Sequence, residues 1–460
     1  MDMSDTISQV LAAYATSVPD ELDADTAHET KRRLIDTLAV ALGAHQQPAP
    51  RAARRYAYAF EVADGCRIWG TPFASTPEVA TLANGVAVRY FDYNDTYLSL
   101  EPLHPSDTIA GLISAAEWIG ASGRQLLTAV AVAYEVGMTL CDALSVRRHG
   151  WDHVNVTSIA ACCGLGRLLD LDQRTLEQAL AITVVPHAAM RQTRAGELSM
   201  WKGFAAADAV RQAVYACALA ASGVTGPYRP FEGEMGFVQQ LLGGSVPNRQ
   251  AIDRLAAARA PTRIAESYLK AWPVEYHAQS AVQAALSLHH EVKEAGAIEE
   301  VTIETFKAAY EIIAKDPEKW RPQTRETADH SLPYIVSVAL LDGQVDQTSF
   351  SSKRIRDETL QAFLKDKVTL LQADDLSAGY PDGIPSRITV KSEGGSKLVR
   401  EVTYPIGHAR NRMTDERLEE KYRELTEPLL GEAHAGELLN RLRALEAIGD
   451  VSDLTAQLVV

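Results

Sequence analysis

The stretch LLTAVAVAYEVGMTL, residues 126–140, decides the fold class of this chain. It is apolar on nearly every side and longer than a typical strand, so it predicts a helix buried inside a helical core. Alanine is frequent here and in the run AAADA at residues 205–209, and such small side chains let neighbouring helices approach closely. The first part of the chain therefore favours an all-helical body.

The helical period recurs on the amino-terminal and carboxyl-terminal sides of this stretch. Apolar residues follow helical spacing in Ile7–Tyr14 and again in Leu34–Leu42, where the next residue, Gly43, is a typical helix stop. Leu176–Ile182 predicts another buried helix. We expect this pattern to continue to about residue 268.

The pattern changes after Pro273. Residues 278–293 predict one more helix, but VTIETF at 301–306 alternates as a half-buried strand does. The segments SRITVKS at 386–392 and KLVREVTY at 397–404 flank two adjacent glycines, which is typical of a hairpin. This part of the chain therefore predicts a smaller α+β domain.

The tail returns to helical spacing over residues 414–445. We therefore expect a mainly α protein, in which a large all-helical domain carries an inserted smaller α+β lid domain. The predicted boundaries are 1–268 for the first part of the helical domain, 269–404 for the lid and 405–460 for the return to the helical domain.

The composition limits the classes of partner. The 460 residues carry a formal net charge of −15, which argues against nucleic acid and anionic membranes as partners. An anionic substrate would then need a local cluster of basic side chains. The five cysteines form no CxxC pair, and the start, MDMSDTISQV, lacks the apolar region of a signal peptide. Apolar stretches such as Val214–Val224 are too short to span a bilayer, so we expect a reduced, cytoplasmic protein.

The densest group of reactive side chains lies at Tyr90–Asp107, YFDYNDTYLSLEPLHPSD. Its Asp, Asn and Pro residues are also typical of an ordinary surface loop. The functional interpretation is that Pro102 and Pro105 stiffen the loop and direct His104 at a substrate. Histidine suits general acid/base catalysis because its pKa lies near neutrality.

Two further segments could bind an anionic substrate. GWDHV at 150–154 puts His153 beside the start of a predicted helix, where the dipole favours negative charge, although Asp152 could be a simple helix cap. The segment Arg191–Asp208 concentrates Arg191, Arg194 and Lys202 ahead of an alanine-rich helix. A solvated basic face is the alternative, but a partly buried lysine would need an anion such as a carboxylate ligand.

Three more segments lie at or near the predicted domain junctions. They are LKAWPVEYHAQ at 269–279, DHSLPY at 329–334 and YPIGHARNR at 404–412. Arginine forks bind carboxylates bidentately, and ligand clefts often lie between domains.

The motifs that are missing also restrict the chemistry. The sequence has no HExxH, no iron–sulfur cysteine spacing, no phosphate-binding loop and no GxSxG. The glycines of Gly164–Gly166 lack the third glycine and the preceding strand of a dinucleotide site. We therefore expect acid/base chemistry on an anion, with no metal and no cofactor.

These segments together resemble the 2-methylcitrate dehydratase family (MmgE/PrpD), which also contains cis-aconitate decarboxylase and iminodisuccinate epimerase. The resemblance covers nearly the whole chain, in the family's order. It is carried by DYNDTYLSLEPLHPSD at 92–107, DHV at 152–154, WKGFAAADA at 201–209, WPVEYHAQ at 272–279, ETADHSLPY at 326–334 and YPIGHAR at 404–410.

The resemblance implies a helical domain with an inserted α+β lid, an active site between them and a homodimer. Site positions of the decarboxylase branch match Asp92, Thr96, His104, His153, Lys202, Lys270 and Tyr334 here. A further lid histidine of that branch falls nearest Glu275, and the only histidine close by is His277. This departure leaves the contribution of the lid open.

The spacer LSLEPLHPSD and the ending YPIGHAR look like the dehydratase branch of the family. We therefore predict a hydro-lyase that dehydrates 2-methylcitrate, or a similar tricarboxylate such as citrate, to the cis-aconitate-type alkene. The alternatives are a decarboxylase that forms itaconate from cis-aconitate, an epimerase or isomerase of a small dicarboxylate such as iminodisuccinate, and a helical interaction protein without activity.

The predicted mechanism assigns proton transfer to His104 and His153, without deciding which is the base. Asp92 would orient one of the two histidines, and Lys202 would hold a substrate carboxylate beside them. Tyr334 would protonate or hydrogen-bond the leaving group. The predicted substrate-binding residues are Thr96, Arg191, Arg194, Lys270, His277, His408 and Arg410.

Overall fold

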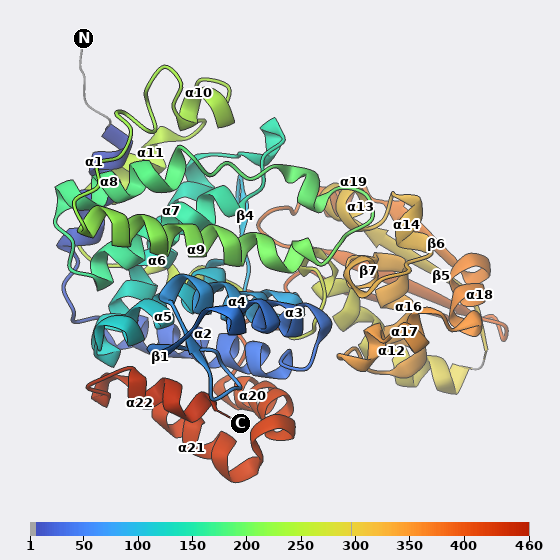
Figure 1. Ribbon diagram of the computed structural model, residues 1–460. Helices are drawn as coiled ribbons and strands as arrows, with labels where there is room; N and C mark the ends of the chain where they lie inside the picture. Colours follow the sequence, from blue (N-terminus) through green and yellow to red (C-terminus); the bar gives the residue numbers. More distant parts are fainter. Residues whose placement is uncertain (1–5, 296, 460) are drawn as a thin grey trace.

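The computed structural model describes residues 6–295 and 297–459 (Figure 1). Most of the chain is helical, and the strands that form a sizeable sheet lie in the later part of the sequence. The predicted fold class, mainly α with a smaller α+β part, is confirmed. In Figure 1 the large helical body carries the α+β part on one side, drawn in yellow to orange.

The body is built from helices of the first 257 residues and of the tail. They are α1 (Thr6–Ser17), α2 (Ala24–Gly43), α3 (Pro48–Ala57), α4 (Pro77–Tyr90), α5 (Ile109–Ile119), α6 (Gly123–Ala143), α7 (Val154–Leu168), α8 (Gln173–Val184), α9 (Trp201–Ala221), α10 (Phe237–Leu241), α11 (Arg249–Ala257), α20 (Asp415–Leu430), α21 (Glu432–Arg443) and α22 (Ser452–Thr455). Two short antiparallel strand pairs join them: β1 (Glu61–Arg67) with β2 (Ala74–Ser75), and β3 (Tyr97–Leu98) with β4 (Pro102–Leu103).

Helix α6 contains the stretch that predicted a buried helix. It begins at a capping box in which Ser122 and Gln125 satisfy each other's backbone donors. It packs against α7, where Gly164 is required because a Cβ atom there would lie 2.7 Å from the carbonyl oxygen of Ala129. Among the described helices, α6 alone is long and apolar enough to cross a membrane by length and composition, but 94% of that apolar stretch is buried in the body.

The tail packs back on the body through α20 and α2, which lie side by side in Figure 1. Their contact includes a fully buried ion pair, in which Lys421 Nζ lies 2.6 Å from Asp36 Oδ1. The same ammonium donates to the carbonyl oxygens of Tyr93 and Lys270, so the tail also holds the two segments that lead into the site described below.

The α+β part, called the lid below, surrounds a sheet in the order β6-β5-β7-β8. Its strands are β5 (Ile298–Thr305), β6 (Val368–Gln372), β7 (Ser386–Ser392) and β8 (Lys397–Val402). Its helices are α12 (Gln279–Ala295), α13 (Lys307–Ile313), α14 (Pro317–Trp320), α15 (Arg325–Ala328), α16 (Leu332–Asp342), α17 (Ser352–Ile355), α18 (Glu358–Lys367) and α19 (Asp374–Ser377).

The predicted hairpin is β7–β8, which is antiparallel and turns at Gly395 with a φ of +83°. The strand β6 was not predicted. It pairs parallel to β5 at the edge of the sheet, with Val301 opposite Val368. A short edge strand that follows a helix directly carries little sequence pattern of its own.

Two hydrophobic cores organise these elements. One contains the body helices with Met413 and the later tail residues, and the other contains the lid with α12 and α16. The body core and the lid core meet where Thr96 and Tyr268 form an antiparallel backbone bridge. The Thr96 N–H donates to the Tyr268 carbonyl at 3.0 Å, and the Tyr268 N–H donates to the Thr96 carbonyl at 2.7 Å. Leu98, which follows in β3, packs in the lid core. The loop predicted to carry the site thus lies at the junction.

Candidate active site

The site is built around Asp92, two residues after the end of α4. Its φ of +49° lies in the left-handed region, which is uncommon for residues other than glycine and is best tolerated by Asp and Asn. This turn directs the side chain into the protein, where Asp92 is only 1% exposed. Lys270 Nζ donates to both the carbonyl oxygen and Oδ1 of Asp92, at 2.7 Å each.

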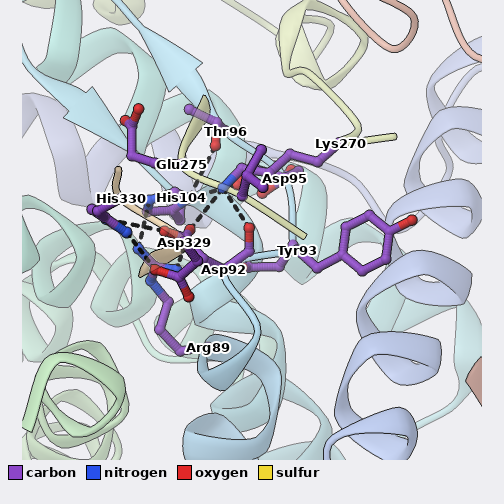
Figure 2. A network of polar contacts seen from close by, with 12 residues as sticks. Arg89, Asp92, Tyr93, Asp95, Thr96, His104, Lys270, Glu275, Asp329 and His330 are labelled. Atoms are coloured by element: carbon purple, nitrogen blue, oxygen red, sulfur yellow. Dashed lines mark hydrogen bonds and ion pairs between the residues drawn. The ribbon is translucent and has the colours of Figure 1, made fainter. Parts of the chain in front are cut away.

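Basic side chains surround the Asp92 carboxylate, as Figure 2 shows for Arg89, Lys270 and His330. Arg89 Nη1 lies 2.5 Å from Oδ1, and Lys202 Nζ lies 3.4 Å from Oδ2. Burial alone would raise the pKa of Asp92, but Arg89, Lys270 and Lys202 outweigh it and hold the pKa well below its ordinary value. Asp92 is therefore a permanent carboxylate that neutralises buried cations.

His330 belongs to the same cluster and comes from the lid. Its Nδ1 lies 2.6 Å from Asp329 Oδ1, and its Nε2 lies 3.3 Å from Asp92 Oδ2. Asp92, Asp329 and His330 have ligand atoms within 4.8 Å of one another, a spacing that could hold a metal ion. Lys202 Nζ, however, lies 3.2 to 3.4 Å from an atom of each of the three, so an ammonium already supplies the positive charge at that point.

His104 lies above this cluster and is held from both ring nitrogens. Nδ1 lies 2.7 Å from the carbonyl oxygen of Asp95 and 3.1 Å from Thr96 Oγ1, and Nε2 lies 2.9 Å from Arg89 Nη2. Because a carbonyl can only accept and a guanidinium can only donate, the ring is neutral, with its proton on Nδ1. Burial and then Arg89 keep the pKa of His104 well below its ordinary value.

His153 has one free nitrogen. Its Nδ1 lies 3.1 Å from Asp152 Oδ1, so the proton is on Nδ1 and Nε2 carries a lone pair. Nε2 is buried and has no hydrogen-bond partner among the residues that the structure describes. Burial lowers the pKa of His153 to about 3, and Arg194, Arg89 and Arg191 act in the same direction. An uncommitted, neutral imidazole nitrogen is the arrangement that a general base needs.

The two predicted histidines lie together. The ring centres of His104 and His153 are 5.7 Å apart, in an edge-to-face arrangement. Thr96, also predicted, contacts His104 directly. Asp92 reaches His104 only through Arg89, which bonds to both. The sequence therefore identified a group of side chains that the fold does bring together.

Arg194 and Arg191 lie on the His153 side of the site. Arg194 Nε lies 3.1 Å from Asp152 Oδ2, while its Nη2 is buried without a partner in the described part of the chain. Arg191 is half-buried and interacts electrostatically with Asp152 and Arg194. Both arginines therefore lie where an anion beside His153 would be.

The two predicted lysines are buried, but protein carboxylates already pair with them. We expected Lys202 and Lys270 to bind substrate carboxylates because a buried lysine needs an anion. The anions are Asp92 and Asp329 for Lys202, and Asp92 for Lys270, which is fully buried. The positive charges of the two lysines therefore pair with carboxylates of the protein in the Asp92 cluster.

Tyr334 and His277 lie within the lid instead of at the histidine pair. Tyr334 is fully buried, and its hydroxyl donates to the carbonyl oxygen of Ser349 at 2.6 Å. The hydroxyl proton of Tyr334 is thus used in this hydrogen bond, and this arrangement does not support the predicted role of Tyr334 as a proton donor. His277 lies 2.7 Å from Glu275 through Nδ1 and 3.4 Å from the Tyr380 hydroxyl through Nε2. It reaches the cluster only through Glu275.

His408 and Arg410 also differ from the prediction of substrate contact. His408 stacks on Tyr268 with ring centres 4.6 Å apart, and so supports the junction between lid and body. Arg410 is more than half exposed and pairs with Asp382 while donating to the Tyr404 hydroxyl. Its charge is satisfied on the surface, away from the buried cluster.

Sequence reasoning gave no role to several members of the site, although the segment 329–334 was among its candidates. They are Arg89, Asp329, His330 and the pairing of Asp152 with Arg194. The adjacent Asp329-His330 ahead of a Ser–Leu–Pro helix start was a usable signal, because Ser331 caps the next helix and fixes the orientation of the pair. Arg89 gave no signal, since it occupies the last turn of an ordinary helix.

Glu101, in the same loop, predicts a pH dependence of stability. It is fully buried, and its Oε2 accepts from Ser145 Oγ at 2.8 Å and from the Arg147 backbone N–H at 3.1 Å. Burial raises the pKa of Glu101 from 4.5 to about 7, so the folded protein binds this proton more tightly than the unfolded chain does. Its contribution to stability is therefore complete below about pH 4.5 and is lost as the pH rises through 7.

We expect Glu101→Gln to remove this part of the pH dependence. Relative to the wild type, the variant should gain roughly 3 kcal/mol in unfolding free energy between pH 4.5 and pH 8. Urea denaturation at several pH values measures this difference, with the exposed Glu197→Gln as the matched control. Parallel pH profiles for the wild type and Glu101→Gln would contradict the assignment.

Comparison with known proteins gives family matches along most of the chain. The MmgE/PrpD N-terminal domain matches residues 9–250, and the MmgE/PrpD C-terminal domain matches residues 272–446. The chain is 30% identical over 411 residues to 2-methylcitrate dehydratase of Escherichia coli strain K12, covering 84% of this chain and 82% of that protein. It is 30% identical over 417 residues to 2-methylcitrate dehydratase of Cupriavidus necator, covering 85% and 84%. A fungal alkylcitrate dehydratase is 27% identical over 396 residues, covering 79% and 75%.

Proposed function

We propose that this chain, which belongs to the MmgE/PrpD family, is a hydro-lyase that dehydrates 2-methylcitrate or a similar tricarboxylate, such as citrate, to the cis-aconitate-type alkene. The relatives at about 30% identity are named 2-methylcitrate dehydratase, which supports this class of reaction. The single structural observation that carries the proposal is the free Nε2 of His153 beside the His104 ring.

Dehydration needs a base for a weakly acidic C–H beside a carboxylate and a proton for the departing hydroxyl. His153 is the better base, because its Nε2 is uncommitted whereas the Nε2 of His104 already accepts from Arg89. The proton that His153 removes returns to the hydroxyl, from His153 itself or through His104. The substrate then loses one hydrogen and one hydroxyl as water, and neither histidine changes its net protonation.

Binding of the substrate would also prepare the base. The pKa of His153 is low because of burial and nearby arginines. A polyanionic substrate beside those arginines adds negative charge and raises the pKa of the imidazole, which makes it a stronger base in the complex than in the free protein. The base would thus become effective when the correct ligand is bound.

Asp92 and the cations around it would hold the shape of the site. Arg89 joins the Asp92 carboxylate to His104, and Lys202 joins it to the Asp329–His330 pair of the lid. The network therefore fixes His104 and docks the lid in one arrangement. This proposal replaces the predicted carboxylate-binding role of the two lysines with a structural role, and it requires no metal ion.

Proton NMR of the purified protein with 2-methylcitrate, citrate and cis-aconitate tests the reaction. We expect the methyl doublet of 2-methylcitrate to be replaced by the signal of a methyl group on the new double bond, and a vinyl signal to appear from citrate. Relative rates will rank citrate against 2-methylcitrate. Itaconate methylene signals from cis-aconitate would instead identify a decarboxylase. If none of the three compounds changes, while deuterium exchanges into a small dicarboxylate, an epimerase replaces the proposal.

The predicted homodimer and cytoplasmic location are part of the same proposal. Light scattering after size-exclusion chromatography measures the first, and fractionation of the source cells measures the second.

A further inference from the structure

The basic side chains near the site differ in how many carboxylates they face. Arg89, Lys202 and Lys270 pair with Asp92 and Asp329, and Arg89 also faces Asp107 at 3.9 Å. This group is therefore internally neutralised. It offers no spare positive charge to a ligand with several carboxylates.

A second basic group lies on the body beside His153. Its arginines come from two segments that backbone bonds hold together: Arg191 N–H donates to the Gly150 carbonyl at 3.0 Å, and Asp152 N–H donates to the Ala189 carbonyl at 2.9 Å. Trp151 and Met190 form an antiparallel bridge between them. Arg147 and His153 lie on the first segment, and Arg191 and Arg194 lie on the second.

Arg147 is fixed by the loop that carries His104. Glu101 Oε2 accepts from the Arg147 backbone N–H and from Ser145 Oγ, which holds the turn in place. The Arg147 side chain stays half-buried, and its positive charge opposes the burial that raises the pKa of Tyr380 in the lid. Arg147 thus lies between body and lid, on the same side of the site as Arg191.

Among the described residues, this second basic group has fewer negative charges around it than it has positive charges. Asp152 is a carboxylate, since burial is outweighed by Arg194 and the pKa of Asp152 stays below its ordinary value. Glu101 is only about half ionised at pH 7, because burial raises its pKa to about 7. After burial, the main influence that lowers the pKa of Arg191 is the like charge of Arg147. Three guanidinium groups thus face between one and two negative charges.

Two buried nitrogen atoms beside the arginines also lack partners within the described ranges. They are Nε2 of His153, a residue that is nine-tenths buried, and Nη2 of Arg194. Buried polar atoms are nearly always hydrogen-bonded in folded proteins, so unpaired ones next to excess positive charge point to an anionic ligand.

We propose that Arg147 and Arg191 form a carboxylate subsite that selects tricarboxylates over dicarboxylates, by binding the carboxylate farthest from the carbon beside His153. Arg194 takes a carboxylate next to the reacting carbon. Arginine forks suit this task because they bind carboxylates bidentately. The subsite rests on the proposed function, since it names which groups distinguish the substrates of that same site.

Tricarballylate and methylsuccinate test the subsite without turnover. Methylsuccinate is tricarballylate without one of its terminal carboxylates, and neither compound carries a hydroxyl that could leave. We expect isothermal titration calorimetry to show that the wild-type protein binds tricarballylate at least tenfold more tightly than methylsuccinate. Each charge-assisted hydrogen-bonded pair corresponds to roughly a ten- to hundredfold change in affinity.

Arg147→Ala and Arg191→Ala should weaken tricarballylate roughly ten- to hundredfold and leave methylsuccinate nearly unchanged, which removes the preference. Arg147→Lys should keep part of it, because the charge remains but the fork is lost. Arg148→Ala is the matched control, since Arg148 is the next residue and is exposed. It should preserve the wild-type ratio.

Two results would overturn the subsite: a wild-type ratio near one, or an unchanged ratio in both Arg147→Ala and Arg191→Ala. Circular dichroism and thermal melting confirm that each variant is folded before its ratio is used. Failure of the proposed reaction is seen separately, because the NMR assay can be negative while tricarballylate still binds with the expected preference.

Discussion

Replacing His153 with alanine is expected to lower kcat roughly 10²- to 10⁴-fold, because general acid/base groups contribute factors of this size. The expectation follows from the free Nε2 of His153, its contact with Asp152 and its position beside His104. Turnover of 2-methylcitrate, followed by alkene absorbance or NMR, measures the loss. His104→Ala should also be strongly impaired, since the two rings share one site.

His149→Ala is the control for this experiment, because His149 lies four residues away and is exposed. It should retain wild-type turnover. Folded His153→Ala protein that keeps more than a tenth of the wild-type rate on every tricarboxylate would remove His153 from the mechanism.

The pH profile of the wild type gives a second measure of the same group. Since the pKa of His153 is about 3 in the free protein, the base stays deprotonated from about pH 4 upward. We therefore expect kcat/KM to show no acid limb from this group near neutral pH. The limb in kcat, which reports the complex, should lie at higher pH, because bound carboxylates raise the pKa of the imidazole.

Asp92→Asn is expected to lower the free energy of unfolding by roughly 3 to 5 kcal/mol, because it leaves buried cations without their carboxylate. Asparagine keeps the size of the side chain and tolerates the positive φ of this position, so neither a cavity nor the backbone explains the loss. Arg89, Lys270 and Lys202 would all lose an ionic partner at once. Urea denaturation monitored by circular dichroism measures the change.

The surface variant Asp382→Asn gives the comparison. It also removes an aspartate from an ion pair, that with Arg410, but both side chains are more than half exposed. Exposed pairs contribute at most about 1 kcal/mol. If Asp92→Asn is no less stable than Asp382→Asn, then the buried cluster does not depend on the Asp92 charge.

The contrast between the two basic groups explains why the sequence could not separate cations that are paired within the protein from cations that are available to a substrate. Lys202, Lys270, Arg191 and Arg410 are all cations in the candidate segments, and the sequence offers no way to rank them. A cation is available to a ligand only when its neighbours do not neutralise it. Lys270 Nζ lies 2.7 Å from a carboxylate oxygen, whereas the strongest influence of a neighbouring charge on Arg191 is the like charge of Arg147. The partner of Lys270 is 178 residues away along the chain.

Much of the fold was predictable from local pattern. The segment 386–392 predicted β7 with its observed bounds, and the apolar stretch at 126–140 lies within α6. These elements can be recognised in the sequence because a helix or strand with one buried face repeats its apolar residues at a regular spacing. The edge strand β6 was missed because its five residues alternate too briefly to be distinguished from the helix before it.

What the sequence by itself determined is therefore the helical body, the α+β insertion and the family, together with the loop around His104. These features depend on local periodicity and on short motifs that occur in the family's order along the chain. The tertiary structure alone decided which charges cancel, which nitrogen is free and which tyrosine is buried in the lid. Those properties depend on distances of about 3 Å between residues far apart in sequence, and electrostatic energy falls with distance in space, not along the chain.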